Sequence, residues 1–112
     1  MTGTDKQIAW ATQIKAEVMA GLAAARQYNA ATLAKYPTTA RDSSAEIEQV
    51  TEWFSSNDNA KWWIDCRDKI STFASTDPCA EAMRLEAIER FVVAVERSRG
   101  RRVCMPVYRP YR

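Results

Sequence analysis

The chain contains no histidine among its 112 residues. Histidine is the commonest general base and a frequent metal ligand, and it activates the Ser and Cys nucleophiles of many hydrolases. The three glycines lie far apart and form no phosphate-binding loop. We therefore expect no catalytic residues, no metal site and no cofactor, and a protein that works by binding and not as an enzyme.

Long apolar runs are missing as well. No apolar stretch approaches the ~20 residues that a membrane-spanning helix needs. The first seven residues lack the basic start and the apolar stretch of a signal peptide. The three cysteines, Cys66, Cys79 and Cys104, form no CxxC motif and cannot all pair within one chain. These absences predict a cytoplasmic protein with free thiols and no membrane partner.

With only three glycines and four prolines, the chain favours long helices over a turn-rich β architecture. Thr4 and Gln7 have the spacing of a capping box, which starts a helix by satisfying free backbone N–H groups. Apolar side chains then follow at steps of three and four residues: Ile8, Ala11, Ile14, Val18, Leu22 and Ala25. This pattern predicts a first helix that ends before Pro37. A bend in this helix is expected near Asn29.

Three further helices are predicted after the first. Ser43 and Glu46 have a second capping-box spacing, which opens a short helix with an apolar face. A third helix is expected near residues 59–71, and a long fourth helix from Asp77 to Gly100. Its apolar face comprises Leu85, Ile88, Phe91, Val92 and Val95. Because each apolar face must be buried, we predict an all-α fold, a small irregular four-helix bundle.

Charge is distributed unevenly along the chain. Residues 1–96 carry ten basic and fourteen acidic side chains, whereas residues 97–112 carry six arginines and no acid. We therefore divide the chain into a helical domain, residues 1–100, and an extended tail rich in Arg, Tyr and Pro, residues 101–112.

The tail supplies the first candidates for partner contacts, which are Arg102, Tyr108, Arg109 and Tyr111. Arginine makes bidentate contacts to phosphate or carboxylate, and tyrosine stacks on bases or fills pockets. The target is left open between a nucleic acid and an acidic surface of a protein, and a merely solvated terminus is the third interpretation.

The third predicted helix combines tryptophan with arginine. Trp62 and Trp63 diverge by about 100° on a helix, so one of them can lie at the edge of the core. We assign structural roles to Trp63 and Trp10, and treat Trp62 as a further partner contact on condition that it is exposed. Arg67 falls within an apolar arc, so we assign it a structural role, buried or half-buried and paired. An anchor in a partner interface is the alternative for Arg67.

Two segments, KQIAWA at residues 6–11 and NAKWWIDCR at residues 59–67, carry a resemblance to known proteins. The chain resembles small helical proteins of phages, plasmids and other mobile elements that combine a "KQ[IV]xWA" helix with a later "A[KR]xxIDxR" helix. An inhibitor of type I CRISPR–Cas systems is similar at both places. The resemblance covers about twenty of the 112 residues. We expect five of these residues to pack together: Ile8, Trp10, Trp63, Ile64 and Arg67.

The resemblance implies a phage or mobile-element accessory protein that inhibits a defence system in the cytoplasm of a bacterial host, as an anti-CRISPR does. It implies stoichiometric binding to a protein partner, such as a type I CRISPR effector subunit or its nuclease. DNA mimicry is disfavoured because the net charge is +2. The alternative is a small nucleic-acid-binding accessory protein that uses the basic tail. A structural or oligomerisation module is a third hypothesis.

Overall fold

The computed structural model describes residues 1–74 and 80–98, and these residues are mostly helical. They form five helices: α1 (Asp5–Lys35), α2 (Ser44–Ser55), α3 (Ala60–Asp65), α4 (Ser71–Ala74) and α5 (Glu81–Ser98). The predicted all-α class is confirmed. The expected start of the last helix at Asp77, its stop at Gly100 and the tail of residues 101–112 all lie outside the described residues.

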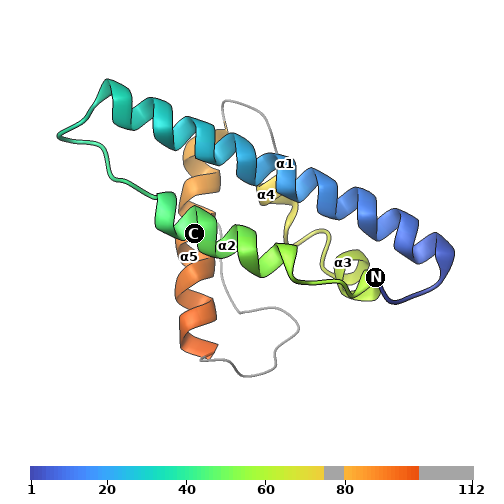
Figure 1. The fold of residues 1–112 in the computed structure, drawn as a ribbon. Helices are drawn as coiled ribbons and strands as arrows, with labels where there is room; N and C mark the ends of the chain where they lie inside the picture. The colour runs from blue at the N-terminus through green and yellow to red at the C-terminus, as the bar shows by residue number, and fades with distance from the viewer. Residues whose placement is uncertain (75–79, 99–112) are drawn as a thin grey trace.

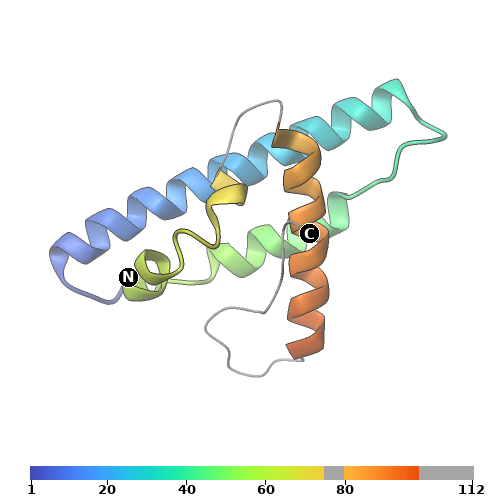
Figure 2. The same ribbon diagram turned by 180° about the vertical axis from the view of Figure 1, so that it is seen from behind.

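Helix α1 is the long element that every other helix contacts (Figure 1). Helix α2 runs antiparallel beside it, α3 lies near the N-terminal part of α1, and α4 lies against the middle of α1, at Gly21. Helix α5 crosses the α1–α2 pair steeply, as the view from behind also shows (Figure 2). The predicted four-helix bundle is therefore not confirmed, because a bundle needs helices that are nearly aligned. Among the described residues, no helix is both long enough and apolar enough to cross a membrane.

The predicted boundaries of α1 are confirmed. The Gln7 backbone N–H donates to Thr4 Oγ1 at 3.2 Å, and the Thr4 backbone N–H donates to Gln7 Oε1 at 3.1 Å. Together these two hydrogen bonds make the capping box. The helix ends at Lys35, with Tyr36 as its C-cap directly before Pro37. Helix α1 continues through Asn29, where we expected a bend.

Asn29 instead joins α1 to the start of α2. Its side chain is buried, accepts the Ser43 backbone N–H at 3.0 Å and donates to Asp42 Oδ1 at 3.2 Å. The expected capping box at Ser43 is wrong, because Ser43 has ψ near 13° and makes no side-chain capping bond. The Asp42 carboxylate accepts the Ser44 backbone N–H at 3.0 Å in its place.

The expected third helix is divided in two. Asn59 caps α3 by accepting the Trp62 backbone N–H at 3.2 Å, and Cys66 is already the C-cap of that helix. The Lys69 and Ile70 backbone N–H groups then donate to the Cys66 carbonyl at 2.9 and 3.2 Å. This turn separates α3 from α4, so side chains beyond residue 65 do not follow the periodicity of α3.

The core is centred on an aromatic cluster between α2, α3, α4 and α5. Phe54 is fully buried, and its ring centroid lies 5.1–6.2 Å from those of Trp62, Trp63, Phe73 and Phe91. Gly21 brings α1 close to α4, since a Cβ atom at Gly21 would lie 1.6 Å from the Phe73 carbonyl oxygen. The core therefore depends on a close helix–helix approach as well as on large aromatic rings.

Candidate interaction surface

The two segments that carry the resemblance meet at the surface of the molecule. The Arg67 guanidinium lies over the Trp10 ring, 5.0 Å from its centroid, which is the geometry of a cation–π contact. Arg67 Nη1 also donates to the Ile64 carbonyl oxygen at 2.6 Å, near the C-terminal end of α3. Both side chains are exposed, Trp10 to 47%. We call Trp10 and Arg67 the Trp–Arg pair.

The expectation that Arg67 is buried or half-buried is wrong. It assumed that one helix runs through residues 59–71, which would turn the Arg67 side chain toward the apolar face. Because α3 stops at Asp65, Arg67 lies in the following turn, and its side chain extends over the outside of α1 to Trp10. The guanidinium thus gains an aromatic face and a carbonyl oxygen as partners while it stays in contact with water.

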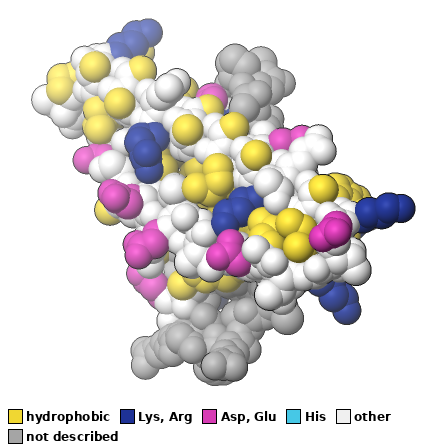
Figure 3. Space-filling view, turned by 45° about the vertical axis from the view of Figure 1, so that its right-hand side comes forward, with side chains coloured by type: hydrophobic (Ala, Val, Ile, Leu, Met, Phe, Trp, Pro, Cys, Tyr) yellow, Lys and Arg dark blue, Asp and Glu magenta, His cyan; other side chains and the backbone are white. Residues whose placement is uncertain are grey.

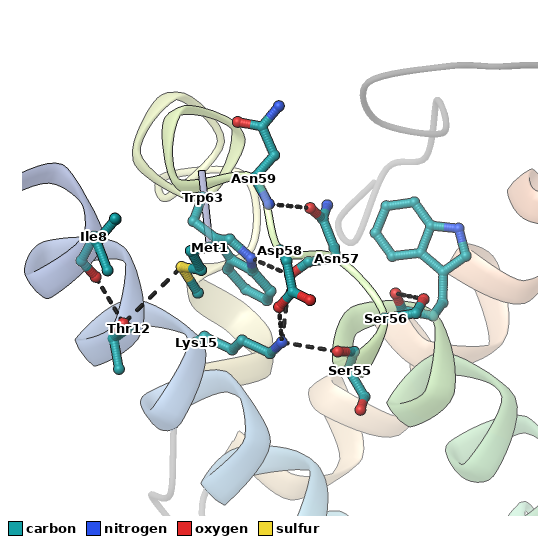
Figure 4. A network of polar contacts seen from close by, with 11 residues as sticks. Met1, Ile8, Thr12, Lys15, Ser55, Ser56, Asn57, Asp58, Asn59 and Trp63 are labelled. Atoms are coloured by element: carbon teal, nitrogen blue, oxygen red, sulfur yellow. Dashed lines mark hydrogen bonds and ion pairs between the residues drawn. The ribbon is translucent and has the colours of Figure 1, made fainter. Parts of the chain in front are cut away.

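A second contact joins α1 to the turn between α2 and α3, and it centres on Lys15 of α1. Its Nζ atom donates to the Ser55 carbonyl at 2.8 Å, the Asn57 carbonyl at 3.3 Å and Asp58 Oδ1 at 3.3 Å. Figure 4 shows the Lys15 side chain reaching from α1 to this turn between α2 and α3. The Trp63 indole N–H donates to the same Asn57 carbonyl at 2.9 Å. The network fixes the position of α3 relative to α1.

The residues before α1 add a third contact. The Thr2 backbone N–H donates to the Asp58 carbonyl at 3.0 Å, and the Ala60 N–H donates to the Thr2 carbonyl at 3.2 Å. Gly3 follows with φ of 142°, a backbone conformation that side chains disfavour. The start of the chain, α1 and the start of α3 therefore form one connected region.

The two adjacent tryptophans both belong to the interior. Trp63 is fully buried and Trp62 is 7% exposed, so the condition for treating Trp62 as a partner contact is not met. Its ring lies 5.5 Å from that of Trp53 and 5.1 Å from that of Trp63, measured between centroids. The buried Trp62 indole N–H has no hydrogen-bond partner among the described residues. Aromatic packing from α2 and α3 covers Trp62, one of the two tryptophans that helical periodicity left as candidates for the edge of the core.

The other four predicted contact residues, Arg102, Tyr108, Arg109 and Tyr111, lie outside the described residues. On the face seen in Figure 3, hydrophobic side chains reach the surface in several small groups separated by acidic and basic side chains. Within residues 1–74 and 80–98, no three Cys, Asp or Glu side chains lie close enough together to hold a metal ion.

Two charged residues were missed by the sequence analysis. Lys15 gave no signal, because its three acceptors come from a turn far away in the sequence. Arg84 did give a signal of burial, because it lies on the same helical stripe as the apolar residues Ile88 and Phe91, at steps of four and three residues. Its side chain is 0% exposed and its Nη1 donates to Glu81 Oε2 at 2.7 Å.

The geometry is suited to recognition. An exposed tryptophan held by an arginine offers apolar area and charge on a support fixed by Lys15 and the start of the chain, which is the chemistry common at the centres of protein interfaces. No protein-family model, no curated protein and no solved structure matches the chain.

Proposed function

We propose that the protein is a phage or mobile-element accessory protein that inhibits a bacterial defence system, as an anti-CRISPR does, by stoichiometric binding to an effector protein. The observation that carries the proposal is the Trp–Arg pair. Two segments that resemble such proteins, distant in sequence, come together there and leave an aromatic ring and a guanidinium exposed.

In this proposal the Trp–Arg pair is the contact on the helical body, and the tail residues Arg102, Tyr108, Arg109 and Tyr111 form a second contact. Trp and Arg contribute large free energies at interfaces because they combine apolar area with directed hydrogen bonds. The body carries more acidic than basic side chains and the tail only basic ones. An effector partner would therefore meet an aromatic surface from the body and positive charge from the tail.

The test is a pull-down of tagged protein from nuclease-treated bacterial lysate, followed by mass spectrometry. Trp10→Ala is compared with Tyr28→Ala, because Tyr28 is also an exposed aromatic residue of α1 and is 38% exposed. We expect the wild type and Tyr28→Ala to retain a type I CRISPR effector subunit or its nuclease, and Trp10→Ala to lose it. Circular dichroism must show that both variants are folded.

A full-length variant with alanine at the four tail positions tests the second contact in the same assay. Reduced recovery with the fold intact supports a role for the tail. If Trp10→Ala and the tail variant both recover the effector as the wild type does, neither surface makes the contact and the proposed mode of binding is wrong.

The concentration of six arginines in residues 97–112 favours one other function, which is binding of nucleic acid through the tail. Because such binding releases counterions from phosphates, its affinity should fall steeply with salt concentration. Nucleic acid retained only when nuclease is omitted, with no effector protein recovered, would favour this alternative.

A further inference from the structure

Arg67 is an exposed arginine whose charge no carboxylate of the described residues neutralises. Its guanidinium lies over the Trp10 ring, and its Nη1 atom donates to the Ile64 carbonyl oxygen at 2.6 Å. Asp65 and Asp68 are close in the sequence and exposed, yet neither is among the ion pairs of the described residues. A ring and a backbone carbonyl therefore orient the guanidinium while its charge stays available.

Two hydrogen-bond donors on one edge of the Arg67 guanidinium, Nε–H and one Nη2–H, have no acceptor in residues 1–74 and 80–98. They point in parallel from the planar group, and their spacing matches the two oxygen atoms of a carboxylate. Because the side chain is exposed, an acceptor from another molecule can approach this edge. A carboxylate would make two charge-assisted hydrogen bonds there, to a cation that is already oriented.

The Trp10 ring supplies apolar area next to this charge, since it is 47% exposed. Lys6 lies one turn earlier on the same side of α1, because residues four apart are neighbours on a helix surface. Lys6 is also exposed and forms no ion pair within the part of the chain that the structure describes. Exposed aromatic rings pair favourably with other rings. The surface therefore suits a partner that presents an aromatic side chain beside a negative charge.

A single carboxylate fits this surface better than a polyanion does. Nucleic acids present a row of phosphates, and their binding depends on several basic side chains along that row. Here Asp65 and Asp68 are exposed within two residues of Arg67, so they would repel neighbouring phosphates. Acidic side chains also outnumber basic ones by fourteen to ten in residues 1–96. The charges favour a protein partner with one isolated acidic group at this place.

We propose that the Trp–Arg pair recognises a carboxylate next to an aromatic side chain in its protein partner. The carboxylate accepts hydrogen bonds from Arg67 Nε–H and Nη2–H, and the aromatic side chain packs on the Trp10 ring. Lys6 attracts the same negative charge from one turn away. This inference rests on the proposed function, because it names the chemistry of the effector surface that the Trp–Arg pair contacts.

The first test titrates small probes into the wild-type protein and follows the Trp10 indole N–H and Arg67 Nε–H signals by proton–nitrogen NMR. N-acetylphenylalanine combines a ring with a carboxylate, whereas N-acetylphenylalaninamide has the ring without the charge. At pH 7 and constant ionic strength we expect saturable shifts of both signals, with the amide binding about three- to tenfold more weakly. Equal affinity for the two probes, or no saturable shift with the acid, would overturn the proposal.

Thymidine 5′-monophosphate, which carries a base and a phosphate, is titrated in parallel under the same conditions. We expect it to bind more weakly than N-acetylphenylalanine, because the acidic side chains beside Arg67 repel its two negative charges. Tighter binding of the nucleotide would overturn the proposal and assign the Trp–Arg pair to nucleic acid.

The second test repeats these titrations with variants that circular dichroism shows to be folded. We expect Arg67→Gln to bind the acid and the amide equally, Arg67→Lys to keep only part of the preference, and Trp10→Ala to lose both probes. Arg26→Gln is the matched control, because Arg26 is exposed on α1 and its loss changes the net charge by the same amount. Equal loss of the preference in Arg67→Gln and Arg26→Gln would contradict the proposal.

The carboxylate contact and the proposed function fail in different experiments. Preference for the acid probe without recovery of an effector in the pull-down would mean that the proposed function is wrong, while the chemistry of the Trp–Arg pair stands. Recovery of an effector that depends on Trp10, with equal binding of the acid and the amide, would mean that the function stands and the carboxylate contact is wrong.

Discussion

Asp42 is a single carboxylate on which the start of α2 depends. Hydrogen bonds lower the pKa of its carboxyl group from the ordinary value of 3.8. The bond from the Ser44 hydroxyl has the largest effect, followed by those from the Ser44 backbone N–H and the Asn29 amide. Because these bonds favour the ionised form, the folded-state pKa lies below the unfolded-state pKa. The stabilisation is therefore fully present above about pH 5 and is lost as the pH falls through the lowered pKa.

The prediction is that Asp42→Asn destabilises the protein at pH 7 and loses most of that effect near pH 3. At the lower pH the wild-type carboxyl is largely protonated in the unfolded chain, so it contributes less to the difference between the two proteins. Urea denaturation of both proteins at the two pH values measures it. Asp65→Asn, at an exposed position of α3, is the control. A difference that is equal at pH 7 and pH 3 would show that the ionised form of Asp42 has no special role.

Gly21 sets the distance between two helices. Replacing glycine with alanine inside a helix normally stabilises it by about 1 kcal/mol. Here the added Cβ would lie 1.6 Å from the Phe73 carbonyl oxygen, which belongs to the backbone and cannot rotate away. Helices α1 and α4 would have to move apart.

We expect Gly21→Ala to lower the free energy of unfolding by about 1–3 kcal/mol, the usual cost of overpacking a core. Chemical denaturation measures this change. Ala20→Gly, at the adjacent exposed position of α1, is the control and should cost about 1 kcal/mol through helix propensity alone. Stabilisation by Gly21→Ala would mean that α4 packs less closely on α1 than the structure has it.

The described helices pack around α1 and the aromatic cluster, so we expect them to unfold as one cooperative unit. Helix α1 contacts the other four helices, and Phe54 lies against rings from α2, α3, α4 and α5. A cavity at Phe54 therefore weakens contacts to several helices at once. We expect Phe54→Ala to cost about 3–5 kcal/mol, a large part of the roughly 5–15 kcal/mol that stabilises a typical domain.

Urea denaturation followed by far-UV circular dichroism and by tryptophan fluorescence measures both the cost and the cooperativity. The two probes should give one coincident transition. Val93→Ala serves as the control, because Val93 is 44% exposed and its loss should change stability by less than about 0.5 kcal/mol. Separate transitions for the two probes would contradict a single cooperative unit.

The candidate site was only partly predictable. The two segments with the resemblance contain Trp10 and Arg67, so the sequence drew attention to both residues. Periodicity, however, placed Arg67 on the apolar face of a helix through residues 59–71, whereas α3 ends at Asp65. Periodicity also left open that Trp62 is exposed and contacts a partner, although side chains of α2 and α3 cover it. Arg84 was recognisable as a charged member of an apolar stripe, but nothing local showed that its side chain is fully buried.

The sequence by itself determined the helical class and the extent of α1. Capping by Thr4 and Gln7, the apolar stripe and the proline after Tyr36 act over a few residues, so they are readable without the fold. The tertiary structure alone decided that α5 crosses α1 and α2 steeply, that Trp10 meets Arg67 outside the core, and that Arg84 is buried. These features depend on contacts between residues far apart in the chain, and local periodicity contains no information about which distant surfaces meet.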